Sequence, residues 1–169
     1  MCLPEFTEDG LLPPGTYQLT IQELRDSRLV TGLSSIFQDN WDREWRSQLI
    51  DNLEILISFL WKGGIKEVFI DGSFVEDKSH PNDIDGYFNC TLAEYEKITS
   101  TCTILDLSQR IKRKPIMWFE YKVELYPNWN QASGIKDEFG YDQPFPSAFR
   151  RSREGQEKGI IQIVKEKKS

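Results

Sequence analysis

Two aspartates at alternate positions of an apolar segment could share a metal ion. Asp83 and Asp85 flank Ile84, and alternate side chains of an extended strand point to the same face. Their carboxylates would then lie side by side while Ile84 packs into the core. Magnesium prefers such hard oxygen ligands and binds through one or two carboxylates together with substrate phosphates. The spacing therefore predicts a magnesium site, although a solvated strand edge would carry the same pair of acids.

A third carboxylate on a neighbouring strand would complete this ligand set. The alternation over residues 116–126 predicts a third strand, in which Glu120, Lys122 and Glu124 share one face. Glu124 is the preferred candidate because apolar residues flank it on both sides, and Glu120 is the reserve. An acid on the polar face of a half-buried strand is also ordinary, so the role of Glu124 is a hypothesis.

The dipeptide Gly72-Ser73, which precedes Asp83 by nine intervening residues, could bind phosphate. Gly72 follows an expected strand over residues 66–71, and the missing side chain lets backbone N–H groups approach an anion. The Ser73 hydroxyl can donate one further hydrogen bond. We therefore expect a phosphate anchor upstream of the predicted metal ligands.

Two groups of basic residues could contact a triphosphate or nucleic acid. One is the loop over residues 110–114, and the other lies over residues 150–158, where Arg150 and Lys158 are the best candidates. Solvated faces explain most of the other basic residues. The single histidine, His80, is expected to be a surface turn residue, because one histidine cannot build a zinc site or a catalytic triad.

Together these residues resemble a known signature. Gly72-Ser73, nine further residues and then Asp83-Ile84-Asp85 look like the signature of the DNA polymerase beta superfamily of nucleotidyltransferases. More closely, four stretches resemble a small, uncharacterised bacterial family with that fold, and this likeness covers most of the chain. The stretches are Leu12-Pro13-Pro14-Gly15, Asp71-Gly72-Ser73-Phe74-Val75, Pro81-Asn82-Asp83-Ile84-Asp85, and Phe149-Arg150-Arg151 through Lys158-Gly159-Ile160.

The resemblance implies an α/β (α+β) fold, with helices packed on a nucleotidyltransferase-type mixed sheet in a single domain. It implies two magnesium ions and attack of a hydroxyl on the α-phosphate of a nucleoside triphosphate. The acceptor, a protein, an RNA or a small molecule, stays open. The implied metal ligands and catalytic residues are Asp83, Asp85 and Glu124, and the implied nucleotide-binding residues are Gly72, Ser73, Lys78, Arg150 and Lys158.

Two other function classes stay open beside the transferase. One is a catalytically inert module that keeps the fold and acts through a protein or RNA partner, for example in a toxin–antitoxin or phage-defence system. A chain of 169 residues leaves little room for a separate substrate domain, which favours this alternative. The other is a nucleic-acid binder that uses the basic second half, and the net charge of -6 argues against it.

The elements expected around these residues alternate between helix and strand. Residues 1–35 are expected to form an ordered N-terminal arm, and residues 36–169 the nucleotidyltransferase-like domain. Within the arm, Thr20 and Glu23 form a capping-box pattern that predicts a short helix. From Asp39 onward, apolar residues recur at helical spacing up to the stop at Gly63-Gly64. The core stripe of this helix is Trp41, Trp45, Leu49, Leu53, Leu56 and Leu60.

The second half of the chain is expected to contain a strand, a helix, a long loop and a final strand. Residues 83–90 should form a strand, and a capping box at Thr91 predicts a helix over 92–99. Residues 127–147, rich in Asn, Gly, Pro and Asp, read as a long surface loop. The β-prone run 160–164 is expected to be a hairpin or edge strand before a Lys-rich tail.

Composition limits the remaining possibilities. Residues 1–100 carry 8 basic and 18 acidic residues, and residues 101–169 carry 13 and 9, a division that suits a site for both a cation and an anion. The chain has no apolar run of about 18 residues and no basic secretory start, so we expect a cytoplasmic protein with no membrane partner. Three widely separated cysteines predict reduced thiols rather than a disulfide framework or zinc ribbon.

Overall fold

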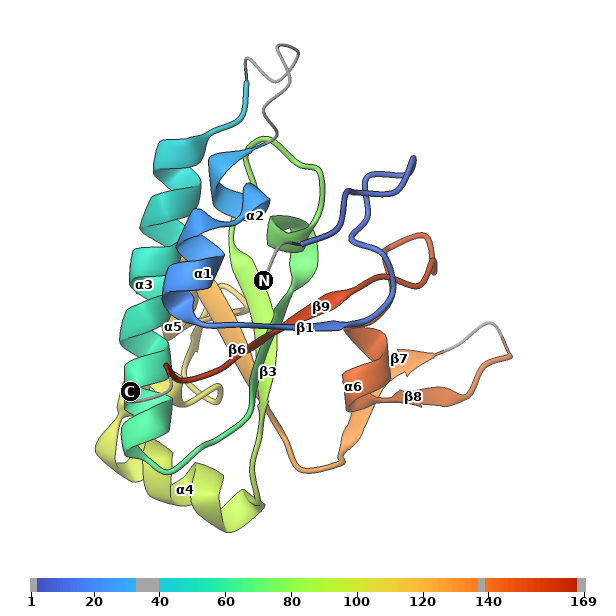
Figure 1. Ribbon diagram of the computed structural model, residues 1–169. Helices are drawn as coiled ribbons and strands as arrows, with labels where there is room; N and C mark the ends of the chain where they lie inside the picture. Colours follow the sequence, from blue (N-terminus) through green and yellow to red (C-terminus); the bar gives the residue numbers. More distant parts are fainter. Residues whose placement is uncertain (1–2, 33–39, 137–138, 167–169) are drawn as a thin grey trace.

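A five-stranded mixed sheet forms the centre of the computed structural model, which describes residues 3–32, 40–136 and 139–166 (Figure 1). The strand order is β1-β9-β2-β3-β6. β1 is parallel to β9 and β3 is parallel to β6, whereas β2 is antiparallel to both of its neighbours. The expected mixed sheet with packed helices in a single domain is thereby confirmed. The strands are Thr16–Leu19 (β1), Val68–Asp71 (β2), Ile84–Asn89 (β3), Val123–Asn128 (β6) and Ile160–Ile163 (β9).

Helix α3 (Arg43–Lys62) provides most of the helical side of the core. Its leucines at 49, 53, 56 and 60 are fully buried, as their spacing predicts. They pack in one cluster with residues on the face of the sheet that is turned toward α3, including Ile70, Ile84 and Leu125. The predicted helix start at Asp39 lies outside the described residues; Asp42 caps the helix instead, since its carboxylate accepts a hydrogen bond from the Trp45 N–H.

The two tryptophans of the predicted stripe do not belong to the buried core. Trp41 precedes the helix and Trp45 lies in its first turn, and both are only partly buried. The Trp45 indole N–H donates to the Pro81 carbonyl at 2.6 Å, and the Trp41 ring lies 3.9 Å from the Arg46 guanidinium. Trp45 therefore joins the helix start to the loop at Pro81 and packs against the edge of the core, while the Trp41 indole N–H donates to the Val30 carbonyl.

The N-terminal segment is joined to the sheet through β1. After β1, the capping box at Thr20 starts α1 (Ile21–Asp26) as predicted, and α2 (Arg28–Thr31) follows directly. Leu24 and Leu29 of these helices are fully buried in the same cluster as α3. Figure 1 shows α1 and α3 on one side of the sheet, with α6 and the β7–β8 hairpin on the other.

The prediction of a hairpin or edge strand over residues 160–164 is wrong. β9 lies inside the sheet, between β1 and β2. Its isoleucines 160, 161 and 163 are all fully buried, which the apolar run of a two-sided interior strand explains. Sequence order gave no sign that a strand near the end of the chain would pair with β1, because their partners are separated by more than a hundred residues.

The predicted strand over residues 116–126 is also wrong in its first half. Residues Ile116–Tyr121 form the short helix α5, which starts after Pro115 and ends at Lys122, whose φ of 53° lies in the left-handed region. Strand β6 begins only at Val123. Glu120 is exposed on α5, so it shares no strand face with Glu124, and the reserve metal ligand is excluded by its position.

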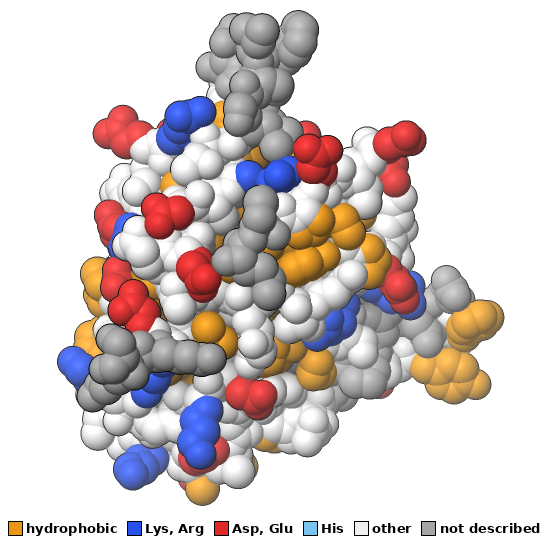
Figure 2. Space-filling view, viewed as in Figure 1, with side chains coloured by type: hydrophobic (Ala, Val, Ile, Leu, Met, Phe, Trp, Pro, Cys, Tyr) orange, Lys and Arg blue, Asp and Glu red, His pale blue; other side chains and the backbone are white. Residues whose placement is uncertain are grey.

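The predicted loop over residues 127–147 contains regular elements. β6 extends to Asn128, and Ala132–Lys136 (β7) pairs antiparallel with Asp142–Pro144 (β8) before the single helical turn α6 (Phe145–Ala148). The hairpin projects from the body of the molecule (Figure 1). Hydrophobic side chains gather at its far end in Figure 2, where Phe139 and Tyr141 are 77% and 73% exposed. Strands this short carry too few residues for a period to be recognised.

The helix expected over residues 92–99 is observed, and the expected thiols are present. Helix α4 covers Leu92–Thr101 behind a complete capping box at Thr91. Cys90 and Cys102 are free, partly buried thiols. No helix in the described ranges combines the length and the apolarity needed to cross a membrane.

Candidate functional site

Three acidic residues lie in one row across three neighbouring strands. Asp71 at the end of β2 pairs with Asp85 of β3, and Asp85 pairs with Glu124 of β6. Cross-strand partners point to the same face, and this face is opposite to the one that packs on α3. The sheet therefore gathers carboxylates on its second face although they are far apart in sequence.

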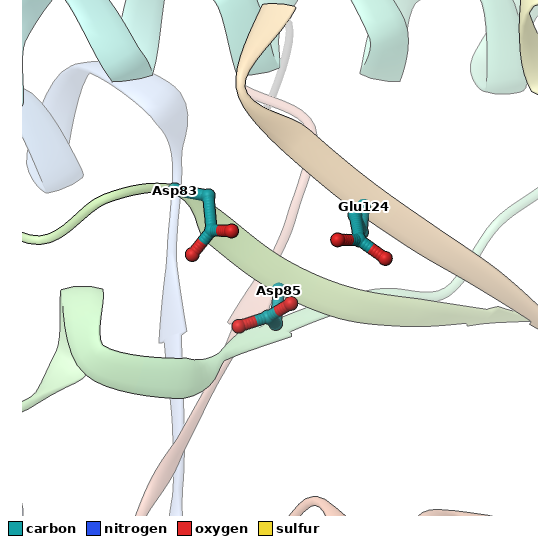
Figure 3. A group of neighbouring side chains, drawn as sticks. All are labelled: Asp83, Asp85 and Glu124. Carbon is teal, nitrogen blue, oxygen red and sulfur yellow. The ribbon is translucent and has the colours of Figure 1, made fainter. Parts of the chain in front are cut away.

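Asp83 joins this row from the residue just before β3. One oxygen of Asp83, one of Asp85 and one of Glu124 all lie within 4.8 Å of one another, and Figure 3 shows the three carboxylates facing a common space. The Asp83 carboxylate is oriented by the Trp118 indole N–H, which donates to its Oδ2 at 2.8 Å. The alternate-face argument for Asp83 and Asp85 thus corresponds to the observed arrangement, with Ile84 fully buried between them.

Glu124 is the most buried of the three, with 3% of its surface exposed. One of its oxygens accepts a hydrogen bond from the Tyr126 hydroxyl. The other accepts from the Lys114 ammonium group, which also lies 3.7 Å from Asp83 Oδ2. The buried acid is therefore compensated by one phenol and one cation.

The electrostatics of the cluster are centred on Asp85. Burial, followed by the nearby charges of Asp83 and Glu124, raises the pKa of Asp85 from its ordinary 3.8 to about 7. Lys114 and Lys158 oppose this rise without cancelling it. An added positive charge would stabilise the ionised form of this carboxylate, so the oxygen atoms of the cluster suit a divalent cation.

Gly72 connects the predicted phosphate anchor to this cluster. It has a φ of +74°, and a Cβ atom at its position would lie 2.4 Å from Asp85 Oδ2. Both observations require glycine here. The residue opens a short 3₁₀ helix, η1 (Gly72–Val75), in which Ser73 is half-buried and lines the cleft beside the carboxylates. The Gly-Ser turn therefore lies directly against one of the proposed metal ligands.

Lys158 and Asp71 form a second charged group beside the turn. Lys158 is only 3% exposed, and its ammonium group lies 3.0 Å from Asp71 Oδ1, contacts the Glu76 carboxylate and lies 3.4 Å from the Gly72 carbonyl. Burial alone would lower the pKa of Lys158, but Asp71 and Glu76 outweigh it and raise the pKa. Sequence analysis selected Lys158 and missed Asp71, although its position directly before Gly72 at a strand end was an available signal.

The loop between the Gly-Ser turn and Asp83 is held by the start of α3. Arg46 is fully buried, and its guanidinium donates to the carbonyls of Leu29, Phe74, Glu76 and Lys78. Burial lowers the pKa of this guanidinium to about 9, so it stays charged at neutral pH. No sequence pattern pointed to this role.

His80 and Ser79 complete the connection between the loop and α3. The His80 Nδ1 atom lies 2.8 Å from Asp42 Oδ2, and the ring stacks on Trp45 with centroids 5.4 Å apart. The Asp42 N–H donates to the Ser79 carbonyl at 3.0 Å. His80 is exposed and lies in a bend, which agrees with its expected place in a surface turn.

A cleft of about 1060 Å³ lies over the carboxylates and the Gly-Ser turn. Gly72, Ser73, Asp83 and Asp85 all line it, next to the buried Glu124. Arg150 does not: its guanidinium donates to Thr16 Oγ1 at 2.8 Å. The neighbouring Arg151 and Arg153, which sequence analysis did not select, line the cleft instead. Its cationic lining residues are Lys78, Lys114, Lys122, Arg151, Arg153 and Lys158.

Comparisons with known proteins place the chain in one family. No curated protein matches it, and no solved structure matches it either. A family model matches residues 4–164 and thus nearly the whole described chain, including every residue of the cleft. The chain therefore belongs to the family whose description is "Family of unknown function (DUF6932)".

Proposed function

We propose that this protein is a magnesium-dependent nucleotidyltransferase related to the DNA polymerase beta superfamily. It transfers a nucleoside monophosphate from a nucleoside triphosphate to a hydroxyl group. The acceptor class stays open among protein, RNA and small molecules. The proposal joins the sequence resemblance to the cleft in which the resembling residues meet.

One observation carries the proposal: the contact between the Gly72 backbone and Asp85. A phosphate anchor and a metal site serve phosphoryl transfer only if one substrate can touch both. With Asp85 Oδ2 only 2.4 Å from the position of a Gly72 Cβ, the two are adjacent. The strand register, which pairs Asp71 with Asp85, holds the glycine beside this carboxylate.

The carboxylate cluster fits magnesium by the chemistry of its donors. Asp83, Asp85 and Glu124 offer only hard oxygen ligands, and their oxygens lie within 4.8 Å of one another. Two of the three already have protein hydrogen-bond donors that fix their orientation, as the supporting groups of metal ligands do. Magnesium, when bound, supplies the positive charge that activates a hydroxyl and neutralises the departing pyrophosphate.

The chain's own residues bind and orient the triphosphate. Gly72 and Ser73 line the cleft, where the Ser73 hydroxyl can donate a hydrogen bond to a phosphate oxygen. Lys78, Arg151 and Arg153 are exposed on the cleft wall and attract the polyanion. Phosphoryl transfer needs no protein nucleophile, so positioning and charge neutralisation are the chain's contribution.

Lys158 pairs with one of the two acidic residues that follow the Gly-Ser turn, which reduces their repulsion of a triphosphate. The Glu76 carboxylate is paired with Lys158, and burial of Phe74 and Val75 turns the intervening chain into the core. Asp77 is exposed, and its N–H donates to the Gly10 carbonyl. The local negative charge is therefore partly neutralised within the protein.

The test is calorimetric titration of each common nucleoside triphosphate with magnesium, followed by an assay for transferred nucleotide. The Asp83→Asn, Asp85→Asn double variant should lose magnesium-dependent binding and transfer. Glu154→Gln is the matched control, because Glu154 lines the same cleft outside the carboxylate cluster. Retained binding and transfer in the double variant would refute the mechanism. Absence of nucleotide binding in the unmodified protein would favour the inert partner-binding module.

A further inference from the structure

A lysine side chain already occupies the face of the carboxylate cluster. The Lys114 ammonium group is hydrogen-bonded to Glu124 Oε1 and lies 3.7 Å from Asp83 Oδ2. With the Tyr126 hydroxyl on Oε2, both oxygens of Glu124 have a protein donor. The side chain of Lys114 is 40% exposed, whereas that of Glu124 is 4% exposed. The cation thus reaches a buried acid from the solvent side.

A short hairpin positions this lysine. Arg110–Ile111 (β4) pairs with Lys114–Pro115 (β5), and the two turn residues Lys112 and Arg113 both have positive φ values, 48° and 71°. The Arg110 guanidinium donates to the carbonyls of Leu107 and Arg113, each at 3.0 Å. The backbone at residue 114 is therefore fixed, while the ammonium group lies at the end of a flexible stem.

A divalent cation and this ammonium group compete for the same carboxylates. Bound to Asp83 and Glu124, a metal ion would lie within a few ångströms of the lysine charge, where two cations in a partly buried site repel each other strongly. Glu124 Oε1 would also have to exchange its lysine donor for the metal. Both effects weaken metal binding as long as Lys114 keeps its position.

We propose that Lys114 is the internal counter-ion of the cluster, and that a divalent cation binds Asp83, Asp85 and Glu124 by displacing the Lys114 ammonium group. The proposal rests on the proposed function, because it takes these carboxylates as metal ligands. Lys114 also lines the cleft, so the phosphates of a nucleotide offer the displaced ammonium group a new anionic partner. Lys114 thereby makes binding of the cation alone weak and binding of the cation with a triphosphate favourable.

The neighbouring lysines have different partners and serve as a comparison. The Lys122 ammonium group lies over the Trp118 ring, 3.6 Å from its centroid, in the same cleft as Lys114. Lys158 is paired with Asp71 and Glu76. Among the described lysines, the contacts with Asp83 and Glu124 belong to Lys114.

The experiment titrates Mn²⁺ alone into metal-free protein and measures free Mn²⁺ by electron paramagnetic resonance. Lys114→Gln should bind Mn²⁺ with a dissociation constant lower by about tenfold or more, because it lacks a unit charge beside two ligands. Lys122→Gln, which removes the same charge from the same cleft, should differ from the unmodified protein by no more than about twofold. Lys114→Arg keeps the charge and should bind Mn²⁺ as weakly as the unmodified protein.

The outcomes separate this proposal from the proposed function. Equal or weaker Mn²⁺ binding by Lys114→Gln overturns the counter-ion role while leaving a metal site in place. Tight binding by Lys114→Arg overturns it too, and tests the role even if the glutamine variant folds poorly. Absence of saturable Mn²⁺ binding in every variant overturns the counter-ion role, whereas the proposed function is overturned separately by the titration of triphosphates with magnesium. A gain confined to Lys114→Gln supports the role, since a merely structural lysine would not raise affinity when removed.

Discussion

Replacing Asp85 with asparagine should change how the stability of the metal-free protein depends on pH. Asp85 lies at the centre of the acidic row, with Asp71 and Glu124 as its cross-strand partners. Burial and the neighbouring acids raise its pKa to about 7 from 3.8. Asparagine has nearly the same shape and no charge to bury, so the variant isolates the cost of ionising this one group.

The sign of the effect follows from where the proton is held. Between pH 3.8 and about pH 7 the folded protein keeps a proton on Asp85 that the unfolded chain has lost. Stability therefore falls as pH rises through this interval. The stability that the raised pKa of Asp85 contributes is fully present below the pKa of the unfolded chain, declines between the two pKa values and is lost above the pKa of the folded protein.

The size of the effect follows from the two pKa values. Each unit of difference corresponds to about 1.4 kcal/mol, and most of the loss for Asp85 falls between about pH 5 and about pH 8. The free energy of unfolding of Asp85→Asn, relative to the unmodified protein, should therefore rise by roughly 2–3 kcal/mol between these two conditions. Because the comparison is between two pH values, any constant effect of the asparagine cancels.

The assay is urea unfolding followed by tryptophan fluorescence, with a chelator present at both pH values. Glu154→Gln, an exposed acid of the same cleft, provides the control and should show little change between them. A difference between Asp85→Asn and the unmodified protein that stays constant within about 0.5 kcal/mol would refute the reasoning. It would mean that Asp85 is ionised without penalty, so that the cluster is better solvated than its burial indicates.

Two further substitutions test the backbone around the site. Gly72→Ala should destabilise the protein by about 1–3 kcal/mol, because it places a side chain at positive φ and against Asp85. It should also abolish magnesium-dependent nucleotide binding. Urea unfolding measures the first effect and calorimetry the second, and unchanged values would contradict the geometry. Arg46→Met should lower the free energy of unfolding by about 3–5 kcal/mol, because it leaves four carbonyls without their buried donor. An unchanged free energy of unfolding in urea would show that water replaces the guanidinium.

The closeness of Asp83 and Asp85 was predictable because it depends on local geometry. Asp83 and Asp85 lie two residues apart around a buried isoleucine, and the period of a strand is enough to place them together. Glu124 was selected from a partly wrong prediction, since the expected strand began at residue 116, seven residues before β6 starts at Val123. The choice still identified a residue of the cluster, because its flanking residues Val123 and Leu125 are fully buried and fix its side of the sheet.

The charged groups around these carboxylates were not predictable in the same way. Lys158 meets Gly72 across 86 positions of sequence, and Trp118 meets Asp83 across 35. Such contacts depend on strand order, and the position of β9 inside the sheet was itself missed. The role of Lys114 was hidden because the basic run over residues 110–114 reads as a solvated loop, whereas a tight hairpin turns one of its side chains toward the acids.

The nine residues between the Gly-Ser turn and Asp83 are held in place by contacts with α3. After η1 the chain has little regular structure of its own until β3, so its backbone carbonyls need partners from elsewhere. Arg46, Trp45 and Asp42 supply contacts to residues 74–81 from the first turn of α3. The position of the Gly-Ser turn relative to Asp83 is therefore fixed by α3, which begins at Arg43, far upstream of the turn. A sequence with the same spacing but without these partners would have the motif and lack the means to hold its two halves together.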